Sequence, residues 1–143
     1  MYNLFLDDDP NRKPHKLHWI ELPLVEWTIV RNYDDFVAII QRQGVPARVS
    51  FDHDLGDTAY REFFRAKDSP DRVICYENIK EKTGYDCAKW LANYCIDNGI
   101  SLPLYYIHTA NPIGAANILS AMESARRIMD ENKTDVAKTE IPS

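Results

Sequence analysis

The sequence predicts an α/β domain, built as a three-layer sandwich around a mostly parallel sheet of four to five strands. Two observations support this fold class. Short apolar segments alternate along the chain with amphipathic ones, and polar side chains follow directly after several of the apolar segments. Alternating strand and helix patterns are typical of β-α-β units, in which helices cover a parallel sheet. The chain has 143 residues, which is enough for one such domain with a single core.

The expected strands are short, apolar and clearly bounded. Residues 2–6 stop abruptly at acids, residues 25–33 are rich in β-branched and aromatic side chains, and residues 47–52 form a third segment. Residues 102–108 are almost continuously apolar, as expected for a strand whose sheet is covered on both faces. We therefore expect four strands, with no visible fifth strand after the last helix. The link between the first two strands, which contains the loop at residues 10–16, shows no helix pattern.

Three helices are expected from capping residues and periodicity. Residues 34–44 begin with acids, and residues 83–99 begin with a capping box at Thr83. The last helix has Asn111 as its N-cap and Pro112 in its first position. Its core face is expected to consist of Ile118, Ala121, Met122, Ala125, Ile128 and Met129.

Residues 55–82 are the least interpretable part of the chain. One short stretch there could form a helical turn, but a following segment with Ser and Pro interrupts it. We expect a surface insertion within a domain spanning residues 1–132, followed by a polar tail at residues 133–143.

Composition and charge narrow the class of protein. Hydrophobic residues make up 45% and charged residues 27%, as in soluble globular proteins. The net charge of −5 disfavours duplex DNA and anionic membranes as partners. The three cysteines are odd in number and lack zinc-site spacing, so Cys87 and Cys95 are expected to be small core residues. With no signal peptide or membrane span in the sequence, we expect a cytoplasmic protein; its oligomeric state cannot be predicted.

Polar side chains follow three of the expected strands. Because parallel strands end at the same edge of a sheet, where α/β proteins bind ligands, we expect these side chains to meet. They are Asp7 and Asp8 after the first strand, with Arg12 close behind; Asp52, His53 and Asp54 after the third; and His108, Thr109 and Asn111 after the fourth.

Carboxylates in close proximity repel one another unless a cation balances them. A hard divalent cation does this, and Mg²⁺ typically takes one or two protein carboxylates together with water and phosphate oxygens. Asp8 and Asp52 are the leading candidate ligands, with Asp7 next, for Mg²⁺ or alternatively Mn²⁺.

The remaining polar groups suit a phosphorylated ligand. Arg12 can contact a phosphate through two N–H groups, Thr109 adds a hydroxyl, and the helix that begins near Asn111 offers backbone N–H groups. His53 and His108 are able to move protons near neutral pH, and Asp54 lies beside His53.

Each of these features also has a purely structural interpretation. The acids after the first strand can form an ordinary turn, and Asp54 and Asp57 can shape a turn at the glycine between them. His53 can be an ordinary loop histidine and His108 a hydrogen-bonded structural one, while Asn111 caps a helix in either case. The convergence of three strand ends is what favours a functional site.

Four segments together resemble receiver-like domains proposed to process cyclic phosphates, which are found in bacteria and bacteriophages and are related to response-regulator receivers. The segments are LDDDPNR, SFDHDLG, TGYDCAKWL and HTANPIGAANI, and the resemblance extends over roughly residues 3–120. It implies a flavodoxin-like fold with a metal-dependent pocket for a cyclic or terminal phosphate. The ligand would be a phosphorylated small molecule, a nucleotide or an RNA end.

Three functions are compatible with this resemblance. The first is a metal-dependent phosphoesterase that hydrolyses the phosphate. The second is a module that sequesters a cyclic nucleotide messenger without cleaving it, as a phage anti-defence protein would. The third is a phosphorylation-switched receiver that regulates a partner. Ordinary receivers carry a lysine after a fifth strand, which is not evident here, and they lack the equivalents of His53, Asp54 and His108. These departures favour the first two functions.

Overall fold

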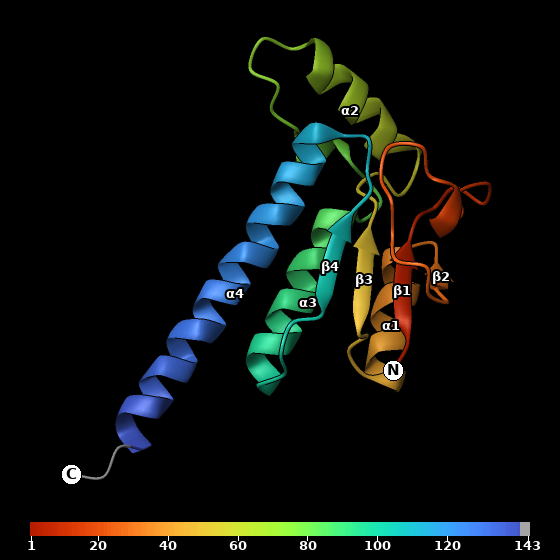
Figure 1. Cartoon of the computed structure of the whole chain (residues 1–143). Helices are drawn as coiled ribbons and strands as arrows, with labels where there is room; N and C mark the ends of the chain where they lie inside the picture. Colours follow the sequence, from red (N-terminus) through yellow and green to blue (C-terminus); the bar gives the residue numbers. More distant parts are fainter. Residues whose placement is uncertain (141–143) are drawn as a thin grey trace.

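The computed structural model describes residues 1–140, with side chains described for residues 1–133. Four strands form one sheet that is parallel throughout, in the order β2-β1-β3-β4 (Figure 1). The predicted α/β fold with a parallel sheet is therefore confirmed, and no fifth strand occurs within residues 1–140. The strands are β1 Asn3–Leu6, β2 Thr28–Val30, β3 Arg48–Phe51 and β4 Leu104–Ile107.

The helices begin close to where the capping residues predict. The capping box at Thr83 is present, with Asp86 as its partner, and Asn111 accepts a hydrogen bond from the Gly114 N–H. The last helix continues beyond the expected domain boundary, and residues 141–143 of the predicted polar tail lie outside the described residues. The α-helices are α1 Tyr33–Gln43, α2 Asp57–Asp68, α3 Gly84–Asn98 and α4 Pro112–Glu140, and the short 3₁₀ helices are η1 Pro14–Lys16 and η2 Tyr76–Asn78.

One face of the sheet packs against helices. Side chains alternate along a strand, so Leu4 and Leu6 of β1 share a face with Val49 and Phe51 of β3. These side chains form a buried core with residues of α1, α3 and α4. From the helices the core includes Phe36, Ile39, Ile40, Cys87, Ala88, Leu91, Cys95, Ile118 and Met122.

The opposite face of the sheet is covered by irregular chain. Phe5, which points away from the helices, lies edge-on to Trp27 with ring centroids 6.4 Å apart, and Trp27 also meets Tyr106. Trp27 belongs to the β1–β2 connection. This connection contains the short 3₁₀ helix η1 and no α-helix, in agreement with the sequence. The outer layer on this side is therefore a loop segment, residues 7–27, rather than a helical layer.

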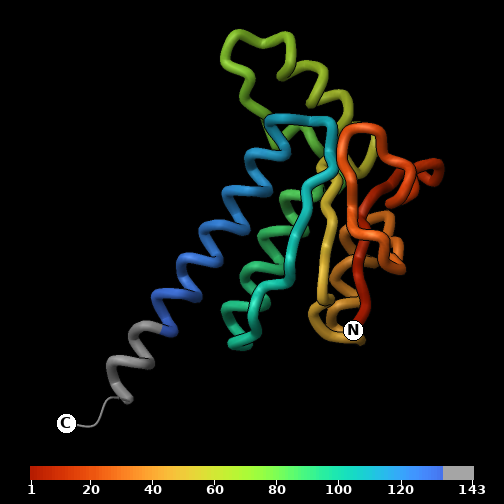
Figure 2. Tube along the Cα trace, viewed as in Figure 1, coloured from red at the N-terminus to blue at the C-terminus, as the bar shows by residue number. Residues whose placement is uncertain are grey.

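The insertion at residues 55–82 lies beyond the carboxyl ends of the strands. It contains α2 and η2, and Figures 1 and 2 show it over the edge of the sheet at which the strand arrows point. Buried Glu62 holds it together, since its carboxylate accepts hydrogen bonds from Arg65, Asn78 and the Cys75 N–H. The insertion therefore adds residues to the edge where ligands are expected.

Three local expectations are wrong. β2 covers only Thr28–Val30, because the residues before it serve the loop: Glu26 accepts a hydrogen bond from Asn3 through its carbonyl. β4 is an edge strand and not fully covered, with Leu104 61% exposed. Ile128 is 43% exposed although the next residue, Met129, packs against the core, so Ile128 lies at the rim of the buried face of α4. Within residues 1–140, no helix is long and apolar enough to cross a membrane.

Candidate metal and phosphate site

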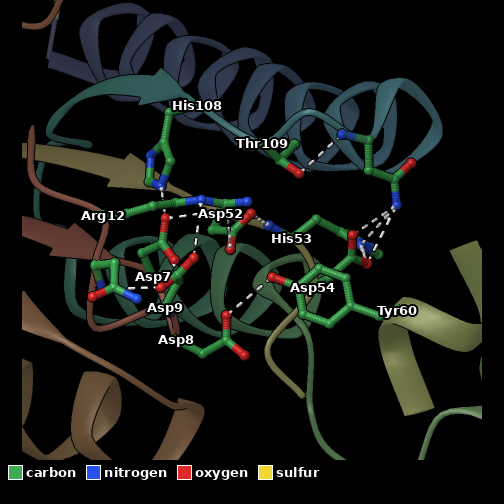
Figure 3. A network of polar contacts seen from close by, with 12 residues as sticks. Asp7, Asp8, Asp9, Arg12, Asp52, His53, Asp54, Tyr60, His108 and Thr109 are labelled. Atoms are coloured by element: carbon green, nitrogen blue, oxygen red, sulfur yellow. Dashed lines mark hydrogen bonds and ion pairs between the residues drawn. The ribbon is translucent and has the colours of Figure 1, made fainter. Parts of the chain in front are cut away.

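Three strand ends converge on one buried group of side chains. Asp7 follows β1, Asp52 follows β3 and His108 follows β4, and all three side chains are buried. One ligand atom from each lies within 4.8 Å of the others. Two carboxylates and an imidazole at this spacing could hold a metal ion. The convergence predicted from the sequence is therefore present (Figure 3).

Asp7 is held in its ionised form. Burial opposes ionisation, but the hydrogen bond with His108, the Asp9 N–H and the charge of Arg12 outweigh it and lower the pKa of Asp7. The His108 Nε2 to Asp7 Oδ2 distance is 3.0 Å, and the Asp9 N–H donates to Oδ1 at 2.9 Å. Arg31 fastens the same turn by donating to the Asp7 and Asp9 carbonyls.

His108 is a neutral side chain that positions Asp7. A carboxylate can only accept, so Nε2 carries the proton, and Nδ1 accepts from the Ser50 hydroxyl at 2.7 Å. The ring stacks on Phe5 with centroids 4.4 Å apart, and burial lowers the pKa of His108. Sequence reasoning missed Ser50, although a hydroxyl in the middle of a buried strand was a usable signal.

Asp52 carries the most unusual atom of the site. It is only 2% exposed, and its Oδ1 accepts from the His53 N–H at 2.9 Å. Its Oδ2 is buried without any hydrogen bond, and Arg12 Nη1 lies 3.5 Å away. Burial, followed by the negative charge of Asp7, raises the pKa of Asp52 to about 8. A buried carboxylate oxygen without a hydrogen bond costs folding free energy and is rare, so these side chains suit a bound cation.

Arg12 and Asp8 lie at the more open side of this group. Arg12 Nη1 is 3.5 Å from Oδ2 of both Asp7 and Asp52, so one guanidinium partly balances both carboxylates. Asp8 is half-buried and turned toward α2, where its Oδ1 accepts from the Tyr60 hydroxyl at 3.2 Å (Figure 3). Within the described residues, Asp7 rather than Asp8 belongs to the metal-capable group. Tyr60 was missed because it lies in the insertion.

His53, Asp54 and Asn111 form a second buried cluster beside the first. His53 Nδ1 lies 2.9 Å from Asp54 Oδ1, and Asn111 donates to the same carboxylate at 3.3 Å. His53 Nε2 lies 3.3 Å from the Tyr76 hydroxyl, which also accepts from Asn117 at 2.7 Å. Asp54 therefore orients a histidine rather than shaping a solvated turn, and both ring nitrogens of His53 have protein partners.

Two glycines allow the helices to approach the end of β3. A Cβ at Gly84 would lie 1.7 Å from the Asp52 carbonyl oxygen, and a Cβ at Gly114 would lie 2.3 Å from Cγ of His53. The starts of α3 and α4 thus press directly against the residues that carry the site.

Thr109 and the start of α4 line the side of the site nearest the second cluster. Thr109 is half-buried, and its Oγ1 accepts from the Asn111 N–H at 3.2 Å, which leaves its own proton to donate. Asn111 uses its side chain for capping α4 and for Asp54. The positive end of α4 faces this region, and such helix ends favour anions.

An acidic cluster at the carboxyl edge of a parallel sheet defines a receiver-like α/β domain. The chain belongs to one family of this class, the cyclic-phosphate processing receiver domains, whose sequence pattern it matches over residues 2–124. No curated protein and no solved structure shows significant similarity to it. The bacterial or bacteriophage origin suggested by the sequence stays a prediction.

Proposed function

We propose that this protein binds a divalent cation through Asp7 and Asp52 and, next to it, hydrolyses a cyclic or terminal phosphate on a nucleotide or RNA end. The observation that supports this most is the buried Asp52 Oδ2 without a hydrogen bond, because a cation would supply its missing partner. Membership in a family linked to cyclic-phosphate processing supports the choice of ligand.

Mg²⁺ is the first choice of cation. It prefers oxygen ligands and keeps several waters, so the two carboxylates suffice, and His108 orients Asp7 from behind. Mn²⁺ is the alternative, since it accepts imidazole more readily, which would bring His108 into direct coordination. His108→Gln separates the two cases: it should weaken Mg²⁺ binding modestly and Mn²⁺ binding strongly if Mn²⁺ is the natural ion.

The other residues suit binding of the phosphate. A bound divalent cation would polarise a phosphoryl oxygen and lower the pKa of coordinated water. Arg12 contacts the remaining phosphate oxygens, and its half-buried side chain already lies beside the carboxylates. Thr109 donates its hydroxyl proton from the opposite side. Asp8 and Tyr60 hold the edge of the insertion over the site.

A second candidate is binding without cleavage, as in a protein that sequesters a cyclic nucleotide messenger. The observation that favours it concerns the histidines expected to move protons. His53 and His108 are fully buried, and all four ring nitrogens have protein partners. Neither histidine therefore presents a free nitrogen to a ligand in this arrangement.

Calorimetry combined with product analysis tests both candidates. The protein is titrated with 2′,3′-cyclic nucleotides and cyclic dinucleotides in Mg²⁺ or Mn²⁺, and the ligand is then recovered and checked for cleavage. Heat with cleavage, both lost in Asp52→Asn, supports the phosphoesterase. Heat with intact ligand supports sequestration. An absence of heat with every one of these ligands contradicts both. Asp57→Asn, which removes an exposed acid nearby, is the matched control.

A further inference from the structure

Trp19 is an exposed aromatic side chain fixed at the border of the acidic site. The residue is 48% exposed, although large apolar residues usually lose most of their exposure on folding. The indole N–H donates to the carbonyl oxygen of His108 at 2.5 Å. The ring is thus held in place by the end of β4 while much of its surface faces solvent.

Arg12 connects this ring to the carboxylates. Its guanidinium carbon lies 5.6 Å from the centroid of the Trp19 ring. The same guanidinium lies 3.5 Å from Oδ2 of Asp7 and of Asp52. One arginine side chain therefore extends from the aromatic surface to the cation site. A nucleotide has the same order of parts, an aromatic base separated from a phosphate by one sugar.

The loop that carries Trp19 also lines a pocket that is open to solvent. A cavity of about 510 Å³ lies between η1 and the following residues, with Trp19 in its wall together with Leu17, His18 and Leu22. This volume falls within the range of small-molecule pockets, and a wall with both apolar and polar groups suits a heteroaromatic ring.

We propose that Trp19 is the base-stacking residue of this protein, so that the ligand is a nucleotide whose base lies on the indole and whose phosphate lies at Arg12 and the cation site. This rests on the proposed function for the position of the phosphate. The rival interpretation is that Trp19 only fastens the β1–β2 connection to β4. The two interpretations differ in what happens to a ligand that has no base.

The experiment compares two ligands in three proteins, in Mg²⁺, by calorimetry. The ligands are 2′,3′-cyclic AMP and the same ribose cyclic phosphate with a methyl group in place of the base. The proteins are the wild type, Trp19→Leu and Trp19→Phe. Base stacking predicts a loss of roughly 5- to 150-fold for cyclic AMP in Trp19→Leu and almost none for the base-free ligand. Trp19→Phe should recover much of the loss, although it lacks the N–H that binds His108.

Several results would overturn the proposal. Equal losses for both ligands, or no loss for either, would leave Trp19 with a structural role. Leu119→Ala, which alters a residue 46% exposed on α4, controls for the loss of exposed apolar surface. Adenosine provides a readout that is independent of the phosphate site: it should quench the fluorescence of the wild type but not that of Trp19→Leu. If neither cyclic phosphate binds the wild type, the proposed function fails, and absent quenching by adenosine would then refute the stacking as well.

Discussion

Replacing Asp52 by Asn should stabilise the metal-free protein and abolish its response to Mg²⁺. The buried Oδ2 has no hydrogen bond, and the neighbouring Asp7 is held ionised, so folding is opposed whenever Asp52 is charged. Asn keeps the shape of the side chain and removes the charge. The variant therefore measures how much the charge of Asp52 lowers the free energy of unfolding.

The pKa of Asp52 sets the size of this effect. It is raised from 3.8 to about 8, so at pH 7 Asp52 is ionised in the unfolded chain and mostly protonated in the folded protein. Each pKa unit corresponds to about 1.4 kcal/mol, and roughly three units separate 3.8 from pH 7. The upper limit of the gain is therefore about 4 kcal/mol. Each kcal/mol should raise the melting temperature by roughly 2–4 °C.

Thermal and urea unfolding in a chelator measure the gain directly. Wild type, Asp52→Asn and the exposed control Asp57→Asn are compared at pH 7, and then again in Mg²⁺. Mg²⁺ should raise the melting temperature of the wild type and of Asp57→Asn only, because a ligand stabilises only the state that binds it. An Asp52→Asn variant that is less stable than the wild type without metal would refute the reasoning, since it would mean that Oδ2 is already well paired.

Three further predictions follow from the same geometry. The metal-free wild type should lose stability as pH rises from about 4 to 8, relative to Asp52→Asn, because the unfolded chain binds fewer protons there; parallel curves in urea unfolding would contradict this. Mg²⁺ binding at pH 7 should release a proton from Asp52, so the calorimetric heat of binding should differ between buffers of different ionisation enthalpy, and this difference should vanish above pH 9. The same heat in all buffers at pH 7 would argue against Asp52 as a ligand. Gly84→Ala should destabilise by more than about 3 kcal/mol, because its Cβ would meet the Asp52 carbonyl; Gly99→Ala, at a left-handed position in open space, should cost only about 1–2 kcal/mol. Equal losses of the two glycine variants in denaturant titrations would contradict the close approach.

The sequence predicts the parts of this fold that have a local signature. Thr83 and Asp86 specify the start of α3 by their own hydrogen bonds, independent of the rest of the chain. The meeting of Asp7, Asp52 and His108 was predictable for a different reason: parallel pairing forces the ends of β1, β3 and β4 to one edge. Chain geometry does not say which of Asp7 and Asp8 turns inward, because the turn after β1 fixes that through the Asp9 N–H.

Apart from Ser50 in β3, the residues that the sequence missed lie in the insertion or in a loop. Tyr60 and Tyr76 belong to the insertion, and Trp19 belongs to a loop interrupted by prolines. Their positions depend on long-range hydrogen bonds, such as the one from Trp19 to the His108 carbonyl, 89 residues away. The exposure of Ile128 was mispredicted for another reason: periodicity gives the apolar stripe of a helix but not how much of its width the neighbouring elements cover, and Ile128 is exposed while Met129 packs against the core.

The loop layer over the second face of the sheet has a consequence for how this family can diversify. The helices together with β1 and β3 supply most of the buried core, whereas one short connection, residues 7–27, contains Asp7, Asp8, Arg12 and Trp19. Substitutions in that connection can alter ligand preference while the helical face stays unchanged. A chimera that exchanges only this connection between two relatives should therefore keep the melting behaviour of its host and acquire the ligand preference of its donor. In this fold, the residues that select the ligand and the residues that form the helical core lie on different segments of the chain, so each set can change without the other.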